Sequence, residues 1–283
     1  MDKVILVNKD AGYTSRDVVN IVSKKLQTKK VGHFGTLDPL ASGLLVLGVG
    51  ALTKLDNFDI FDTKKYVAEV LIGVSTDTYD ITGNIVDKKD VTLDKNDLIK
   101  ALESFNKTYM QEVPIYSAVK VNGKKLYEYA RNNISVELPK KMVTIKDMKL
   151  VSFYNKDGNS YFKFSCTVSK GTYIRSIIND LSHMLNVPLC MSNLVRESEG
   201  KFNLKNANTI DDIKNGNINM LDITDVLDVL KMEITDSLEK KVLNGNVIDY
   251  VIADYVLFMD NGKNIALYKK EIDHMKFLFF FKN

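Results

Sequence analysis

The stretch VGHFGTLDPLASGLLVLGVG, residues 31–50, constrains the fold of this chain more than any other part of its sequence. Glycine lacks a Cβ atom, so it accepts backbone conformations and close approaches that other residues do not. A cluster of glycines therefore indicates tight turns or the close approach of a ligand. Five of the chain's 15 glycines lie in this stretch: Gly32, Gly35, Gly43, Gly48 and Gly50.

A single carboxylate, Asp38, stands among these glycines and is followed directly by Pro39. The proline ring fixes its own φ and moves the preceding residue away from helical geometry, so Asp38 is expected in an extended or turn conformation. The apolar run from Leu44 to Val49 predicts a buried strand. A rigidly held carboxylate beside a core strand is either a reactive group or part of an ordinary Asx turn, and these residues alone favour the turn.

The length and composition of the chain are those of an ordinary globular protein. Its 283 residues can bury a sizeable core, and 45% of them are hydrophobic and 27% charged. The sequence has no apolar run of transmembrane length and no signal-peptide pattern, which predicts a cytoplasmic protein without a membrane partner. Two separated cysteines and three histidines argue against a structural metal site or a disulfide scaffold.

Charge is distributed unevenly along the chain, although the formal net charge is only +3. Residues 117–149 carry eight Lys or Arg against three Asp or Glu, whereas residues 205–240 carry four against eight. A basic segment of this kind suits a polyanionic partner on one side of the molecule. A solvated lysine-rich surface is an equally good explanation.

Three hydrophobic patterns place polar side chains at the ends of secondary structure elements. Thr14 and Asp17 have the spacing of a capping box in front of a helical apolar stripe. Alternation over residues 64–73 predicts a strand with Tyr66 near its start. A further helical stripe begins at Ile174 and puts Tyr173 and Arg175 at its first turn, where exposed N–H groups attract anions.

The C-terminal part of the chain predicts a second, smaller domain. A helix is expected over residues 235–243, followed by short strands at 247–252, 254–259, 264–269 and 276–281. The change from an acidic segment to this β-rich tail sets the predicted division at residues 1–230 and 231–283.

Common cofactor and hydrolase motifs are missing from the sequence. It contains no GxxxxGK[ST] phosphate loop, no complete dinucleotide fingerprint, no nucleophile elbow and no HExxH metal motif. We therefore expect a site built from an aspartate, tyrosines, an arginine and a histidine, with no organic cofactor and no metal.

The segment GHFGTLDPLASGLL, residues 32–45, resembles the signature of the TruB family of tRNA pseudouridine synthases. Further segments resemble the same family in the same order, so the resemblance extends over residues 4–202. These segments are KDAGYTS (9–15), KKYVAEVLIGVSTDTYDITG (64–83), VPIYSAVKVNGKKLYEYAR (113–131), SKGTYIRSIINDL (169–181) and SNLVRESEG (192–200).

The resemblance implies an α+β pseudouridine-synthase fold, with a mixed, mostly antiparallel sheet flanked by helices and a small β-rich PUA-like RNA-binding domain at the C-terminus. It also implies isomerisation of uridine 55 in the T-loop of tRNA by cleavage of the bond to N1 and rejoining through C5. Such an enzyme needs no cofactor, takes the T-arm of tRNA as its partner, and is expected to act as a monomer without a protein partner.

The family's functional positions transfer to individual residues of this chain. Asp38 would be the catalytic aspartate, acting either as nucleophile on C1′ or through a glycal intermediate. Arg175 would pair with Asp38 and hold it ionised. The remaining expected substrate-binding residues are Tyr66, stacking on the uracil; Tyr173, lining the pocket; Leu194, contacting the base edge through its backbone; His33, stacking in the space left by flipped bases; and Asp80, contacting the base.

Two other functions remain open on the sequence. The related guide-RNA-dependent class modifies ribosomal RNA with protein partners, but the short tail and the lack of long basic extensions disfavour it. A tRNA-binding folding chaperone would need the basic surface but not Asp38.

Overall fold

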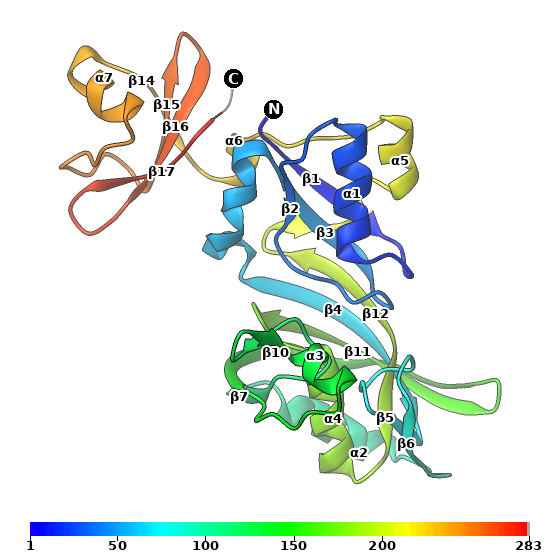
Figure 1. Cartoon of the computed structure of the whole chain (residues 1–283). Coiled ribbons are helices and arrows are strands. Elements are labelled where there is room, and N and C mark those ends of the chain that lie inside the picture. The colour runs from blue at the N-terminus through cyan, green and yellow to red at the C-terminus, as the bar shows by residue number, and fades with distance from the viewer. Residues whose placement is uncertain (282–283) are drawn as a thin grey trace. The chain divides into compact units, whose positions relative to one another are not determined.

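The computed structural model describes residues 1–281, which form two units (Figure 1). The first contains Met1–Pro39, Leu44–Phe58 and the residues from Leu204 onward, and the second contains Leu40–Gly43 and Asp59–Asn203. No helix within residues 1–281 has both the length and the apolar character needed to span a bilayer.

A mixed sheet forms the body of the second unit, with strand order β12-β4-β11-β10-β7. All pairs along this path are antiparallel, whereas Ser42 and Gly43 at the start of β3 (Ser42–Val49) pair in parallel with Val195 and Arg196. The strands are β4 (Thr63–Ile72), β7 (Thr108–Glu112), β10 (Lys140–Lys156), β11 (Asn159–Ser169) and β12 (Leu189–Glu199), and β12 also pairs with β13 (Phe202–Asn203). The predicted mixed, mostly antiparallel sheet is confirmed.

Two helices cover this sheet. The helix α2 (Lys95–Ser104) contacts β10 and α4 (Ile174–Leu185), and α4 contacts β12. Buried Ile177, Ile178 and Leu181 form the apolar stripe of α4, as the periodicity predicts. The smaller elements of this unit are η2 (Asp59–Phe61), β5 (Val74–Thr76), β6 (Ile85–Lys88), β8 (Lys120–Val121), β9 (Lys124–Lys125) and α3 (Leu126–Arg131).

In the first unit, β1 (Lys3–Lys9) is the sheet neighbour of β3, and β2 (Val31–His33) pairs antiparallel with β3. The helix α1 (Ser15–Lys25) begins with the predicted capping box of Thr14 and Asp17. Short helices follow at η1 (Gly50–Asn57), η3 (Leu204–Asn206), α5 (Ile210–Asn215) and α6 (Ile223–Val226).

The C-terminal sheet has strand order β14-β15-β16-β17 and its own hydrophobic core. The strands are β14 (Leu230–Glu233), β15 (Tyr255–Asp260), β16 (Lys263–Lys270) and β17 (Met275–Phe280), with α7 (Asp236–Leu243) contacting β16. The predicted strand at 247–252 is wrong, because only Ile248 forms an isolated bridge, to Met275. The strand β14 was not predicted, since the sequence LKME carries no run of β-branched or aromatic residues.

Close approach of the chain's own backbone explains two glycines of the 31–50 stretch. Gly43 has φ +104°, and a Cβ atom there would clash with the backbone carbonyl of Arg196 and lie 2.8 Å from its nitrogen. A Cβ atom on Gly48 would lie 2.5 Å from the carbonyl oxygen of Leu52 and 2.7 Å from the ring of Phe34. These two glycines are thus required by internal packing rather than by a ligand.

Candidate active site

The backbone on both sides of Asp38 is hydrogen-bonded, on one side to the first residue of α1 and on the other to the turn that precedes α1. The Leu37 N–H donates to Ser15 Oγ at 2.9 Å, and the Gly12 N–H donates to the Pro39 carbonyl at 2.8 Å. Ser15 Oγ also lies 3.2 Å from the Leu37 carbonyl, which it can reach as a donor. The loop that carries Asp38 is therefore held at its two flanking residues, as a catalytic carboxylate requires.

A fully buried lysine, Lys9, holds the turn of residues 10–13 in place through hydrogen bonds. Lys9 has no exposed surface, and its ammonium donates to the carbonyls of Asp10 at 3.1 Å and Tyr13 at 2.6 Å. Burying a cation is costly unless polar atoms surround it, so these contacts fix the path of residues 10–13. Because the Gly12 N–H of this turn donates to the Pro39 carbonyl, Lys9 indirectly holds the Asp38 loop on its C-terminal side.

His33 ends β2, opposite Leu47 in β3, and is half-buried. The following N–H, of Phe34, donates to the Val46 carbonyl at 3.0 Å. The first unit thus contains both His33 and Asp38, one at a strand end and the other in the loop that follows.

In the second unit, Tyr66 lies on the buried face of β4, next to a cluster of charges. Its hydroxyl is 3.5 Å from Nη1 of Arg196, and Nη2 of Arg196 is 3.3 Å from Glu199. Glu199 also pairs with the Lys64 ammonium at 3.0 Å, which donates to the Phe61 carbonyl at 3.0 Å. Burial raises the pKa of the Tyr66 phenol, so Tyr66 is a neutral hydroxyl at neutral pH.

Strand register explains why Tyr66 and Leu194 share one face of the sheet. Tyr66 is the partner of Arg196, and Ala68 is the partner of Leu194, in the antiparallel pair of β4 and β12. Directly opposed residues project from the same side of a sheet. The Leu194 N–H donates to its neighbour's side chain, Asn193 Oδ1, at 2.8 Å, so a base edge would have to compete for that donor.

Arg175, on the first turn of α4, lies among buried acceptors. Its Nε is 3.9 Å from Asp80 Oδ2, and its two terminal nitrogens donate to the carbonyls of Thr78 at 3.2 Å and Tyr116 at 3.1 Å. The other Asp80 oxygen accepts from the Thr78 hydroxyl at 2.9 Å and from the Thr82 N–H at 2.9 Å. Hydrogen bonds to neighbouring groups therefore orient both Arg175 and Asp80, in addition to the contact between the two side chains.

Tyr173 is the N-cap residue of α4 and is half-buried. The buried Gln111 side chain binds its backbone at two points, accepting from the Tyr173 N–H at 2.8 Å and donating to the Tyr173 carbonyl at 3.2 Å. The start of α4, which carries Tyr173 and Arg175, is therefore anchored to β7.

The structure brings Arg175 and Asp80 together and places Tyr66 and Leu194 on one sheet face. Sequence reasoning did not identify Lys64, Arg196, Glu199 or Gln111. One signal was available for Lys64, since its spacing from Tyr66 puts a charge on the inward face of an alternating strand. Arg196 and Glu199 gave no such signal, because β12 does not alternate cleanly and its register cannot be read from the sequence.

The chain resembles a set of known proteins closely enough to be compared over nearly its whole length. Residues 23–174 match the model of the TruB family pseudouridylate synthases, N-terminal domain. The chain is 42% identical over 275 residues to tRNA pseudouridine synthase B of Bacillus subtilis (strain 168), covering 94% of this chain and 88% of that protein. It is 40% identical over 289 residues to tRNA pseudouridine synthase B of Staphylococcus aureus (strain MSSA476), covering 94% and 93%.

Solved structures of lower sequence identity share the fold. The structure of a Cbf5-Nop10-Gar1 complex matches with a TM-score of 0.65 and 22% identity, over 97% of this chain and 83% of that one. The archaeal box H/ACA sRNP Nop10-Cbf5 complex matches with a TM-score of 0.63 and 20% identity, over 96% and 79%. At this identity the match shows the fold alone.

Replacing Glu199 by glutamine tests the buried charge cluster. The substitution keeps the shape but removes the anion, so Lys64 and Arg196 lose their shared partner. We expect a loss of about 3–5 kcal/mol in the free energy of unfolding, measured by urea denaturation.

The matched control is Glu197→Gln on the same strand. Glu197 pairs with Lys65 at 2.9 Å, but both side chains are at least 38% exposed, so its loss should cost no more than about 1 kcal/mol. Equal effects of the two substitutions would contradict the structural role of Glu199.

Proposed function

Because this chain belongs to the TruB family of pseudouridylate synthases, we propose that it isomerises uridine to pseudouridine at position 55 in the T-loop of tRNA. The observation that carries this proposal is the 42% identity to a tRNA pseudouridine synthase B over 94% of the chain. The family model alone spans Asp38, Tyr66 and Tyr173.

The reaction breaks the bond between C1′ and N1 of the uracil and forms a bond between C1′ and C5. The proton on C5 leaves and N1 gains one, so no electrons are exchanged with a second substrate. Asp38 is proposed as the catalytic group, either attacking C1′ as in retaining glycosidases or promoting a glycal intermediate. Its loop, hydrogen-bonded through Leu37 and Pro39, supports this role because a displacement needs a fixed carboxylate.

We assign the binding of the flipped uridine to three residues that the second unit holds in place. Tyr66 offers an uncharged ring for stacking, Tyr173 a pocket wall, and Leu194 a backbone contact to the base edge. The role of His33 in the space left by flipped bases and the base contact of Asp80 stay predictions. The same is true of the expected pairing of Arg175 with Asp38; within its own unit Arg175 contacts Asp80.

A stand-alone tRNA enzyme is favoured over a guide-RNA-dependent one. The relatives at 40% identity or more are named tRNA pseudouridine synthase B, whereas the Cbf5 structures share 22% identity or less. We therefore propose that the protein acts on the T-arm of tRNA as a monomer, in the cytoplasm where tRNA is modified, without a protein partner.

The proposed reaction is tested with an unmodified tRNA transcript that carries tritium at uridine C5. Wild-type protein alone should release tritium, and Asp38→Asn should lower the rate on the order of a thousandfold or more, because the reaction loses its reacting carboxylate. Asp10→Asn is the matched control: it removes one exposed carboxylate from the adjacent turn and should leave the rate unchanged.

Three results would contradict the proposal in different ways. No release by the wild type, or equal release by Asp38→Asn, would exclude the catalytic assignment. Release only with an added guide RNA would favour the guide-dependent class. A catalytically silent protein that still binds tRNA, with an affinity that falls steeply with salt, would be a binding protein or chaperone.

We further propose that residues 231–283 form a separate PUA-like RNA-binding domain. The four-stranded sheet and its own hydrophobic core support a division near residue 230. In this sheet Lys269 lies directly opposite Lys276, an arrangement of like charges that destabilises a strand pair. The exposed Glu271 carboxylate, 3.7 Å from the Lys276 ammonium, offsets only part of this repulsion. Binding of a phosphate group would offset this cost.

Replacing both Lys269 and Lys276 by glutamine should therefore weaken tRNA binding at low salt and reduce the salt dependence of the affinity. The control is Lys263→Gln, an exposed lysine at the start of β16. A tRNA affinity unchanged by the double substitution, measured by filter binding, would argue against RNA contact at this surface.

A further inference from the structure

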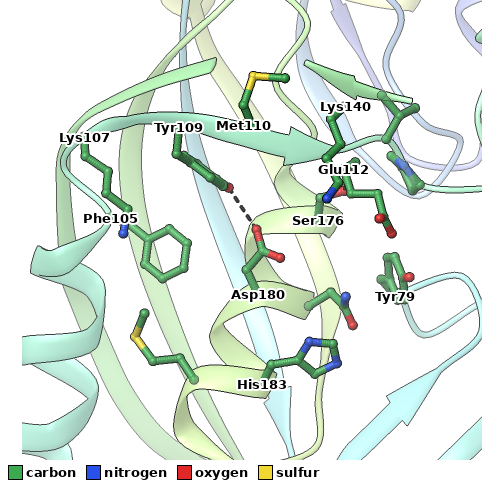
Figure 2. Close-up of a pocket in the computed structure, with 14 residues that line it drawn as sticks. Tyr79, Phe105, Lys107, Tyr109, Met110, Glu112, Lys140, Ser176, Asp180 and His183 are labelled. Atoms are coloured by element: carbon green, nitrogen blue, oxygen red, sulfur yellow. Dashed lines mark hydrogen bonds between the residues drawn. The ribbon is translucent and has the colours of Figure 1, made fainter. Parts of the chain in front are cut away.

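A cavity of about 470 Å³ opens between β7 and α4 in the second unit, apart from the residues assigned above to uridine binding. Figure 2 shows Tyr109 and Glu112 from β7, Asp180 and His183 from α4, and Tyr79 from the turn after β5 around one space. A volume of this size accommodates a ligand as large as a nucleotide.

Flat rings form one wall of the cavity. Phe105, only 2% exposed, meets Tyr109 edge to face with ring centroids 6.0 Å apart. The Lys107 ammonium lies 5.3 Å from the Phe105 centroid, so a cation of the chain already covers these rings from one side. Because the two rings are nearly perpendicular, at 84°, a planar ligand ring can stack on one and meet the other edge to face, and the lysine disfavours a cationic ligand.

Hydrogen-bond acceptors face this space. The Tyr109 hydroxyl donates to Asp180 Oδ2 at 3.0 Å (Figure 2). The same hydroxyl accepts from Gln111 Nε2 at 3.0 Å. These bonds fix the orientation of the carboxylate. Within residues 1–281, Asp180 Oδ1 receives no hydrogen bond, and the Glu112 carboxylate has neither a hydrogen bond nor an ion pair. Carboxylates only accept hydrogen bonds when ionised, so the matching ligand must present donors.

Among the common nucleobases, guanine has the edge that fits these acceptors. Its N1–H and N2–H donors are adjacent and parallel. Together they can donate to the two oxygens of one carboxylate, or to one carboxylate oxygen and one neighbouring amide oxygen. Adenine and cytosine place a ring acceptor beside their amino group, and uracil has one N–H between two carbonyls. Asn179, which also lines the cavity, comes directly before Asp180 on α4.

A lysine at the rim completes the site. Lys140 on β10 is the strand partner of Glu112 on β7, yet within the described residues the two form no ion pair. Its ammonium is exposed and available to a phosphate group.

The back wall is held by a residue in an unusual conformation. Tyr79 has φ 64°, in the left-handed region that costs a tyrosine about 1–2 kcal/mol. Its N–H donates to the Thr76 carbonyl at 3.2 Å, and its carbonyl accepts from the Met191 N–H at 3.0 Å. Strain of this kind persists only where the surrounding structure holds the backbone in place, and strained residues cluster at ligand sites.

We propose that this cavity binds a guanine nucleotide, with the base edge on Asp180, the ring against Phe105 and Tyr109, and the phosphate near Lys140. The proposal is independent of pseudouridine formation. The guanine can come from a free nucleotide or from an unpaired guanosine of RNA, and the two sources share this recognition chemistry.

Isothermal titration of the full-length protein with GMP, AMP and UMP tests the proposal. GMP should bind saturably and at least about tenfold more tightly than AMP or UMP, because only guanine pairs both donors with the carboxylate. Asp180→Asn should abolish this preference, since the amide can still accept from Tyr109 but turns N–H donors toward the base. Asp97→Asn, an exposed carboxylate on α2, is the matched control and should bind GMP like the wild type.

If Asp180→Asn lowers the melting temperature, its loss of binding could reflect loss of folding, so a second variant is needed. Lys140→Gln, at the exposed rim, should weaken GMP about fivefold but leave guanosine unchanged, because only the phosphate contact is lost. Absence of saturable GMP binding at millimolar concentration, equal binding of AMP, or unchanged GMP binding by both variants would overturn the proposal.

Once GMP binding is established, added tRNA separates the two sources. Competition between tRNA and GMP would identify an RNA guanosine as the occupant, and simultaneous binding would identify a free nucleotide. Tritium release by the wild type is measured in parallel, so failure of the nucleotide site and failure of the proposed isomerase are distinguishable.

Discussion

One buried carboxylate, Glu199, compensates two buried cations, and the pairing of β4 with β12 depends on it. Lys64 on β4 and Arg196 on β12 both pair with Glu199, and none of these charges has appreciable contact with solvent. Removing the anion would leave uncompensated cations in the core, so the cluster strongly disfavours any other register of β4 and β12.

That register determines several features of the proposed site. It places Arg196 beside the Tyr66 hydroxyl and brings Leu194 onto the same face as Tyr66. It also brings the Arg196 backbone so close to Gly43 that a side chain there cannot fit. Gly43 follows Asp38 by only five residues and lies at the start of β3. At least one glycine of the 31–50 stretch is therefore needed so that β3, which follows the Asp38 loop, can pack against β12.

Local patterns in the sequence predicted most of the elements that carry the site. The capping box of Thr14 and Asp17, the alternation around Tyr66 and the stripe that begins at Ile174 each correspond to an observed helix or strand end. Such features depend on neighbours a few residues away. The mispredicted strand at 247–252 and the unpredicted β14 lie in the tail, where strand pairing rather than local pattern decides the structure.

Features that depend on distant residues were out of reach of sequence reasoning. The Glu199 cluster joins residues more than 130 positions apart, and Gln111 anchors the start of α4 across 62 residues. The cavity beside Asp180 likewise needs β7 and α4 to meet. The glycine cluster suggested a ligand approach, whereas at Gly43 and Gly48 the approaching group is the chain itself.

We propose that the fixed Asp38 loop and the sheet held by the Glu199 cluster serve the isomerisation of one uridine in tRNA. The most direct measurement maps the product: a complete tRNA transcript is incubated with the protein alone, treated with carbodiimide and read by reverse transcription. The account predicts a single new stop, one nucleotide 3′ of position 55. A stop elsewhere, several stops of equal strength, or none would contradict it.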